Sequence, residues 1–512
     1  MEENKMSKGK EILAILLLTL VIGTGTLAWI VWSSKDNTKM NVTIGDLADV
    51  SFKTGNDINI SNLSPSFYYD DGALTEFSIR KKKGLTTELN TNIYLDITSI
   101  SDELKNDNFK YVLLSSSDGN TYNEVISSSF KDASIGKLSI VTDSPLTDGK
   151  TYYKFYIWID GNNENNETMQ GKSLKGTLNV DVSTPPVNAV TLVEGLDKGE
   201  TGDSGSGVYK VTHSAIPSDS SATGSEIQAV TDYRYYGPNP NNYICLDMEG
   251  GSTCPDKHLY RIIGSIYEEK ENTNRIKVIK ATPLTDGTTS RFSWDYTSSG
   301  SYSNIWATIT SGNYSNSLTS GSQLMKLLNS GAWWNGTSGS YYNNSTTATN
   351  VNFTNYKLSD KAKSYITTSR YYLGGYNNSN ILTSAMYGYE RGTNSSATSR
   401  PLYWDGMVGL LYPSDYGYAA GNTCVTGTTL YNYGAGCKNK GWFYNTKDQW
   451  LVTPNSMAEY SCVFYIYSDG KIGFFGDDNT QFANFVHPVF YLTSTTSIID
   501  GDGTLNNPYI LK

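Results

Sequence analysis

The chain has 512 residues, of which 18% are charged and 12% are aromatic, including 39 tyrosines. Its formal net charge of −10 comes without any basic stripe beyond the short run at residues 80–83. This excludes a nucleic-acid or phosphate binder, because such proteins cluster Lys and Arg on one face. A polar but weakly charged composition predicts a mainly β, secreted protein, and this length predicts two to four domains.

Residues 12–32 form an uncharged apolar run behind a lysine-bearing head. As a helix they would cover about 30 Å, the hydrocarbon thickness of a bilayer. We therefore expect residues 1–33 to be a signal peptide or membrane anchor that delivers the rest of the chain outside the cytoplasm. Cleavage between Ala28 and Trp29 would release an extracellular protein. Without cleavage, residues 12–32 would hold it at the cell surface as a single N-terminal transmembrane helix.

Residues 40–183 contain short β-type runs separated by turn residues, which predicts an antiparallel β-sandwich. Both strand faces are apolar in TYYKFYIWID at 151–160. A strand of this kind is central in its sheet and is covered on each side.

The loop that follows concentrates oxygen-bearing side chains but lacks the ligand ladder of an EF-hand. Asp-Gly here, and DGDG at 500–503, are also typical of hairpin turns. We expect turns, with calcium as the alternative at Asp160, Asn162, Glu164 and Glu167.

Residues 184–226 are rich in Pro, Gly, Ser and acidic side chains, which predicts a linker with at most one short ordered piece, GVYKVTH at 207–213. Residues 227–512 predict a β-rich α+β module. Within it, RIKVIKA at 275–281 alternates as a strand does. Two short helices are expected, at 322–331 and at 358–366, with Ser359 as the N-cap of the second.

All five cysteines lie beyond residue 240, which favours an oxidising compartment. Several pairings are open, and local closure is the most economical. It would join Cys245 to Cys254 and Cys424 to Cys437, and leave Cys462 as a buried thiol.

The string GTGTLAW at 23–29, followed by YYKFYIWIDGNNENNE and GKSLKGTLNVDV, resembles the camelysin/TasA-like family of bacterial secreted proteins. The resemblance covers residues 10–183. It implies a SipW-type signal peptide, a jelly-roll-like β-sandwich and extracellular fibres built by β-strand addition. Residues 29–52 would then be the donated strand. The apolar residues 30–32 depart from the family pattern and leave an anchored, non-polymerising form open.

Residues 230–512 resemble a module that recurs in surface proteins of Gram-positive bacteria. The matching strings are DYRYYGPNPNNYICLD, HLYRIIGSIYE, MVGLLYPSDYGYA, QWLVTPNS and HPVFYLTSTTSIIDGDGTLNNPYIL. The resemblance implies a surface location and a fold related to C-type lectins or formylglycine-generating enzymes. His487 stands where such modules often have Arg before Pro.

No motif for catalysis or zinc binding occurs: HExxH, GxSxG and CxxC are all missing, and the three histidines are far apart. We expect no cofactor and no metal other than the calcium alternative. The first hypothesis is a non-enzymatic adhesin or matrix protein whose distal module binds a glycan or a host protein. The second is a secreted hydrolase of polysaccharide or peptide, using Asp415, Asp477 or Asp478 as acid and base.

Aromatic side chains flanked by Asn, Ser and Gly are typical of contact surfaces, although in a chain this rich in aromatics most of them fill cores. The candidate ligand-binding residues are Trp333, Trp334, Trp404, Tyr412, Asp415, Tyr416 and Tyr418.

Overall fold

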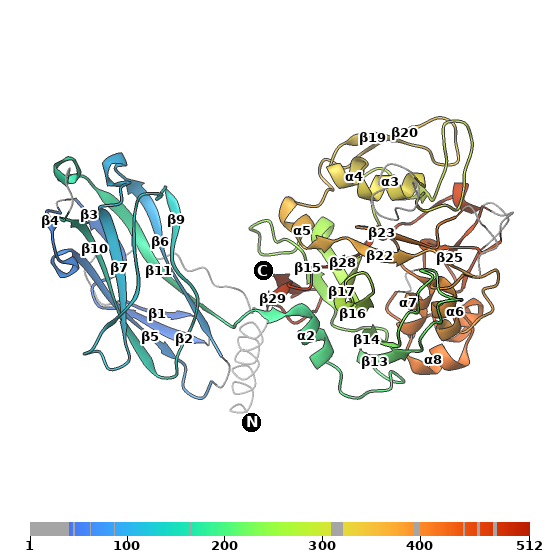
Figure 1. Cartoon of the computed structure of the whole chain (residues 1–512), viewed down its shortest axis with the longest axis horizontal. Coiled ribbons are helices and arrows are strands. Elements are labelled where there is room, and N and C mark those ends of the chain that lie inside the picture. The colour runs from blue at the N-terminus through green and yellow to red at the C-terminus, as the bar shows by residue number, and fades with distance from the viewer. Residues whose placement is uncertain are drawn as a thin grey trace, which may run out of the picture. The chain divides into compact units, whose positions relative to one another are not determined.

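The computed structural model describes residues 40–44, 47–61, 63–85, 88–162, 166–308, 321–393, 400–443, 446–457, 461–474 and 479–512. The chain divides into two compact units between Pro185 and Pro186, and both are built mainly from antiparallel strands (Figure 1). In the described part of the chain, no helix is long and apolar enough to cross a membrane. Residues 12–32 and the expected cleavage site at Ala28 and Trp29 lie outside that part.

The N-terminal unit consists of two sheets that share one hydrophobic core. The larger sheet has the order β1-β2-β5-β10-β7-β8, with β4 also pairing with β10. The smaller sheet has the order β3-β11-β6-β9. The strands are β1 (Met40–Ile44), β2 (Ala48–Phe52), β3 (Asp57–Ile60), β4 (Pro65–Ser66), β5 (Ala73–Lys81), β6 (Asn90–Ile100), β7 (Phe109–Ser116), β8 (Asn123–Ser129), β9 (Gly136–Pro145), β10 (Lys150–Asp160) and β11 (Leu174–Ser183). The sandwich expected for residues 40–183 is therefore present.

Strand β10 is central in the larger sheet, as its two apolar faces predict. It pairs with β5 on one side and with β7 on the other. Phe155, Ile157 and Ile159 point into the core between the sheets. Tyr156 and Trp158 occupy the opposite, outer face and belong to a separate small cluster. The outer face of this sheet is therefore also apolar around β10.

The C-terminal unit is organised around a ten-stranded sheet. Its main path is β12-β29-β30-β15-β16-β17-β28-β21, and β14 pairs with both β16 and β13. The strands are β12 (Val187–Asn188), β13 (Gly207–His213), β14 (Val230–Tyr236), β15 (Tyr243–Cys245), β16 (Leu259–Glu268), β17 (Thr273–Lys280), β21 (Ile366–Thr367), β28 (Val489–Leu492), β29 (Ser497–Asp500) and β30 (Tyr509–Leu511). The alternating run at 275–281 falls on β17, as expected.

Short strands and helices surround this sheet (Figure 1). The strands are β18 (Phe292–Ser293), β19 (Ser338–Tyr341), β20 (Thr349–Asn352), β22 (Ser369–Tyr372), β23 (Tyr403–Gly406), β24 (Gln449–Pro454), β25 (Val463–Ile466), β26 (Ile472–Gly473) and β27 (Ala483–Asn484). The helices are α2 (Ala189–Gly195), α3 (Gln323–Asn329), α4 (Ala332–Asn335), α5 (Asp360–Ser364), α6 (Thr383–Glu390), α7 (Pro413–Tyr418), α8 (Asn422–Gly427) and α9 (Tyr433–Gly436).

Both helices expected in this unit are present. Helix α3 begins after Ser322, whose hydroxyl accepts a hydrogen bond from the Met325 amide. Helix α5 begins after Ser359, whose hydroxyl accepts from the Ala362 amide. These side chains satisfy amide groups that the first helical turn leaves without partners.

The segment 184–226, expected to be a linker, contributes β12, α2 and β13 to the C-terminal unit. Asn188 caps α2 by accepting from the amides of Val190 and Thr191. Val193 is fully buried in the core of the unit. Strand β13 pairs with β14 over its whole length. Strand β13 is the ordered piece expected at 207–213. Helix α2 was not predicted, because the Pro-, Gly- and Ser-rich composition of the segment conceals it.

Candidate functional site

The aromatic residues expected to form a ligand-binding surface lie in the core of the C-terminal unit instead. Six of the seven are at most 4% exposed: Trp333, Trp404, Tyr412, Asp415, Tyr416 and Tyr418. Trp334 is partly buried, with the Lys363 ammonium 5.1 Å from its ring centroid. These residues therefore form no exposed binding platform in this structure.

Asp415 belongs to an enclosed, charge-balanced network. Its Oδ1 accepts from Arg234 at 2.7 Å and its Oδ2 from Lys277 at 2.6 Å. Arg234 also donates to Asp232, whose Oδ2 is 2.8 Å from His213 Nε2. Burial opposes ionisation of Asp415, but Lys277 and Arg234 more than offset it, so that its pKa is lowered. An ionised, enclosed carboxylate is unsuited to act as a general acid. Asp477 and Asp478 lie outside the described residues.

The three histidines serve separate local contacts. His213 bonds Asp232, His258 Nε2 lies 3.1 Å from Glu249, and His487 Nδ1 lies 2.8 Å from the Lys280 carbonyl oxygen. Within the described ranges, no three His, Cys, Asp or Glu side chains are grouped so as to hold a metal ion.

The calcium alternative depends on Asp160, and that carboxylate is already engaged. Its Oδ2 accepts from Lys110 at 2.5 Å, and its Oδ1 accepts from the amide and side chain of Asn162. Glu164 and the side chain of Glu167 lie outside the described residues. At the second Asp-Gly run, Gly501 and Gly503 have positive φ, as turns require.

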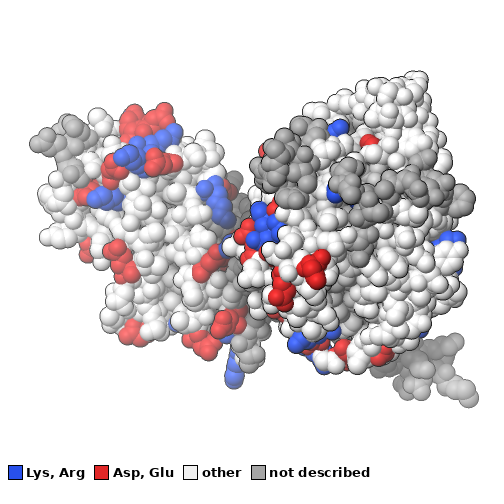
Figure 2. All heavy atoms as spheres, turned by 45° about the vertical axis from the view of Figure 1, so that its right-hand side comes forward, with Lys and Arg blue, Asp and Glu red and all other residues white. Residues whose placement is uncertain are grey.

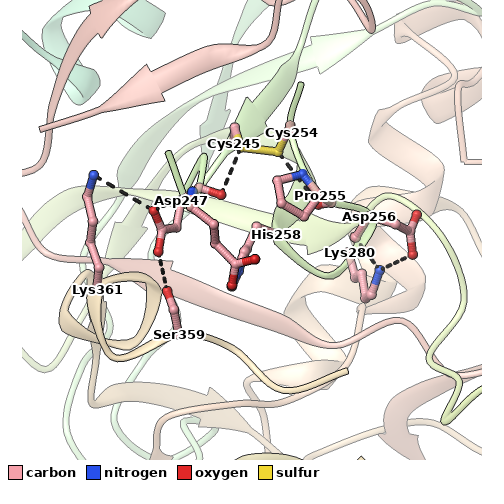
Figure 3. Close-up of a disulfide and its surroundings, with 10 residues drawn as sticks. Cys245, Asp247, Cys254, Pro255, Asp256, His258, Lys280, Ser359 and Lys361 are labelled. Atoms are coloured by element: carbon pink, nitrogen blue, oxygen red, sulfur yellow. Dashed lines mark hydrogen bonds and ion pairs between the residues drawn. A yellow bond between two sulfur atoms is a disulfide. The ribbon is translucent and has the colours of Figure 1, made fainter. Parts of the chain in front are cut away.

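Both expected disulfides are present, Cys245–Cys254 and Cys424–Cys437, while Cys462 is buried and lies outside them. The loop closed by the first is fixed to its surroundings by side chains (Figure 3). Asp247 accepts from Ser359 at 2.5 Å, and Lys280 donates to Asp256 at 3.2 Å. This arrangement fastens the loop to α5 and β17, which is a structural role. Disulfides of this kind are typical of an oxidising compartment.

Charged side chains are sparse on the face of the molecule shown in Figure 2. Lys and Arg alternate with Asp and Glu in small groups, and most of that face is uncharged. A ligand on such a surface is recognised through local groups rather than through a long-range field.

A second aromatic group lies in the N-terminal unit, on the outer face of its larger sheet. Tyr156 stands between Leu74 on β5 and Val112 on β7 in the register of the sheet. The Tyr69 ring lies 5.2 Å from Tyr156 and 6.1 Å from Trp158, measured between ring centroids, with edge-on geometry. Edge-to-face pairs of this kind are favourable contacts. Residues 65–72 therefore cover part of the apolar outer face.

This covering segment is fixed at both ends. At its start, β4 pairs in parallel with the end of β10, and the Gly161 amide donates to the Ser66 carbonyl at 2.9 Å. At its end, Gly72 lies so close to β10 that a Cβ there would be 2.5 Å from the Ile157 carbonyl oxygen. Glycine is required at this position by the close approach of two backbones.

A cavity of about 410 Å³ opens between this segment and the end of β10. Phe67 and Tyr68 at its rim are 68% and 69% exposed, which is unusual for side chains of this size. Four aromatic rings, two carboxylates and an amide line it: Phe67, Tyr68, Tyr69, Asp70, Trp158, Asp160 and Asn162.

The two carboxylates of the cavity differ in their surroundings. Burial raises the pKa of Asp160, but the hydrogen bonds from Lys110 and Asn162 outweigh burial and lower the pKa overall. Asp160 is therefore ionised and paired. Asp70 is exposed, and the described residues place no Lys or Arg in an ion pair with it. The cavity combines apolar ring faces with hydrogen-bond acceptors, the composition of a small-ligand site.

The sequence held two signals for this cavity. The second apolar face of β10 requires a covering element, and the sequence SFYYDDG at 66–72 places three aromatic residues beside two acids. Neither signal says that the two segments meet, because their contact depends on the parallel pairing of β4 with β10.

Neither protein-family models nor curated protein sequences gave any match to this chain.

Proposed function

We propose that the protein is a non-enzymatic, extracytoplasmic surface or matrix protein of a bacterium, and that its N-terminal unit binds a glycan. The proposal rests on the cavity of about 410 Å³ that is lined by Tyr69, Trp158 and two carboxylates. The proposal therefore assigns glycan binding to the N-terminal unit, whereas the sequence suggested the distal module.

A glycan suits this lining for two reasons. The apolar CH face of a sugar ring packs on aromatic side chains, which offer a large rigid surface at low entropic cost. Sugar hydroxyl groups donate to carboxylates such as Asp70 and to the amide oxygen of Asn162. The cavity volume also falls within the range of about 300–1,000 Å³ that small-ligand sites occupy.

The proposal also includes export of the chain across the membrane and self-association of its copies. Residues 12–32 carry the chain across the membrane, and either cleavage after Ala28 releases it or the segment anchors it. Strand β1 is at one edge of the larger sheet, where a strand from another copy can add by main-chain hydrogen bonds. The resemblance of residues 10–183 to the jelly-roll-like camelysin/TasA-like family supports such self-association. The C-terminal unit, related by resemblance to C-type-lectin-like folds, is a disulfide-bonded surface module.

The alternative is a hydrolase that acts on polysaccharide or peptide. A glycosidase needs a second carboxyl group whose raised pKa lets it donate a proton. In the cavity, Asp160 has a lowered pKa and is paired with Lys110. Binding without cleavage is therefore the better supported function of this site.

A panel of immobilised oligosaccharides of glucose, galactose, mannose, glucosamine and N-acetylglucosamine tests the proposal. We expect the protein to retain at least one of them without cleaving it. Tyr69→Ala should weaken that binding about three- to tenfold, because it removes an aromatic contact. Tyr431→Ala is the matched control, because Tyr431 has similar exposure (49% against 41%) and lies outside the cavity. Retention of no oligosaccharide, equal binding by Tyr69→Ala, or release of shortened products would overturn the proposal.

A further inference from the structure

The carboxylates in and beside the cavity differ in whether a basic side chain neutralises them. Asp160 is neutralised by Lys110 at 2.5 Å. Asp70 and its neighbour Asp71 are both exposed, and Asp71 accepts a hydrogen bond from the Ser66 hydroxyl at 2.5 Å. Among the described residues, neither Asp70 nor Asp71 has a basic side chain within ion-pair distance. The cavity therefore presents negative charge that the protein itself does not balance.

We propose that the cavity prefers a glycan with free amino groups, such as a glucosamine polymer, over neutral, N-acetylated or acidic glycans. This inference rests on the proposed function and names the ligand class of the same site.

The aromatic lining supports a cationic ligand independently of the carboxylates. The face of an aromatic ring is negative, and an ammonium group within about 6 Å of the ring centre is attracted to it. Phe67 and Tyr68 supply rings that are largely exposed, Tyr69 supplies a partly exposed ring and Trp158 a buried one.

Asp70 is placed to act together with these rings. It lines the same cavity as Tyr69 and Trp158. Burial is the main cause that raises the pKa of Tyr156, and the Asp70 carboxylate raises it further. Tyr156 contacts Tyr69 and shares a cluster with Trp158, so the Asp70 carboxylate acts on the aromatic group next to the cavity. An ammonium group held there gains a charge-assisted hydrogen bond in addition to the ring contact.

Acetylation converts the ammonium group, which these contacts would recognise, into a neutral amide. The amide of N-acetylglucosamine is uncharged, so that it loses both the ring attraction and the ion pair. A carboxylated sugar would bring a like charge towards Asp70 and Asp71, which is unfavourable. The order of affinity should be amino sugar first, neutral sugar next and acidic sugar last.

Calorimetric titration of the full chain with trimers of glucosamine, N-acetylglucosamine and glucose tests the inference, at a pH at which the amine is protonated. We expect the glucosamine trimer to bind about three- to tenfold more tightly than the other two at low salt. Raising the salt concentration to about 0.5 M should reduce this preference, because exposed charges are screened.

Asp70→Asn should reduce the preference for the glucosamine trimer over the two neutral trimers, because the amide oxygen of asparagine still accepts from sugar hydroxyl groups but carries no charge. Asp132→Asn is the matched control, because Asp132 is an exposed acid of the same unit that does not line the cavity. Equal affinities for the three trimers, or a preference that Asp70→Asn leaves intact, would overturn the inference while leaving glycan binding in place. Binding of none of the trimers would overturn the inference, and the proposed function would fall with it only if the wider oligosaccharide panel were not retained either.

Discussion

Aromatic residues of this chain occupy two environments that their immediate neighbours in the sequence do not distinguish. Trp404 and Tyr412 are flanked by Gly, Pro and polar residues, yet both are buried. Phe67 and Tyr68 have similar neighbours and are largely exposed. The disulfide pairs were easier to predict than side-chain burial, because a short loop between two cysteines makes closure favourable in any fold. Side-chain depth depends on tertiary contacts, so sequence alone identified the disulfides but not the cavity.

His487 makes the free energy of unfolding of the C-terminal unit depend on pH. Burial is the main cause that lowers its pKa from 6.5 to about 4. The unfolded chain takes up this proton below pH 6.5, whereas the folded chain does so only near pH 4. The stability that His487 contributes is therefore present above pH 6.5 and is lost as the pH falls to 4, by about 3 kcal/mol.

Denaturant unfolding at pH 6.5, 5 and 4 checks this in the wild type and in His487→Asn. Asparagine can still donate to the Lys280 carbonyl oxygen, which lies 2.8 Å from His487 Nδ1, but it does not titrate. The free energy of unfolding should fall less steeply with acid in the variant. Parallel curves for the two proteins would contradict this assignment.

Strands were predictable where the sequence alternates, and helices where an apolar period follows a capping residue. Strand β17 alternates, and α3 and α5 each begin after a capping serine. Helices α6, α7 and α8 contain glycine and threonine or aromatic residues without an amphipathic period, and tertiary packing stabilises them instead. In residues 184–226 the alternating run at 207–213 predicted β13, whereas composition averaged over the segment conceals α2.

The segment at 65–72 depends on the close approach of Gly72 to β10. In Gly72→Ala, the new methyl carbon would be 2.5 Å from the Ile157 carbonyl oxygen and 2.8 Å from Trp158 Cβ. The segment must move away from β10, which distorts the cavity. We expect weaker glycan binding and a loss of about 1–3 kcal/mol in the stability of the N-terminal unit, as overpacking produces.

Gly195→Ala is the control, because a Cβ at Gly195 meets nothing within 4 Å and its φ is not in the left-handed region. Calorimetry with the glycan and thermal unfolding give the two readouts. If Gly72→Ala bound the glycan as tightly as Gly195→Ala, the cavity would not be the binding site.

The two units of the whole molecule differ in how they are stabilised. Both disulfides lie in the C-terminal unit, and every cysteine of the chain follows residue 240. The N-terminal sandwich contains no cysteine and packs around a hydrophobic core. Each closed loop contributes about 2–3 kcal/mol to the unit that contains it, mainly by restricting the unfolded chain.

A reducing agent should therefore lower the thermal stability of the C-terminal unit and leave that of the N-terminal unit unchanged. Scanning calorimetry is expected to show two transitions, of which dithiothreitol lowers one and leaves the other in place. The double variant Cys424→Ser/Cys437→Ser identifies the affected transition, because it should shift the same one. A shift of both transitions on reduction would contradict the independence of the two units.

A crystal structure of the protein with a bound glucosamine oligosaccharide would locate the ligand. We expect a sugar ring packed against Tyr69 and Trp158, with its ammonium group beside Asp70. An oligosaccharide bound on the C-terminal unit, with the cavity beside β10 empty, would contradict this expectation.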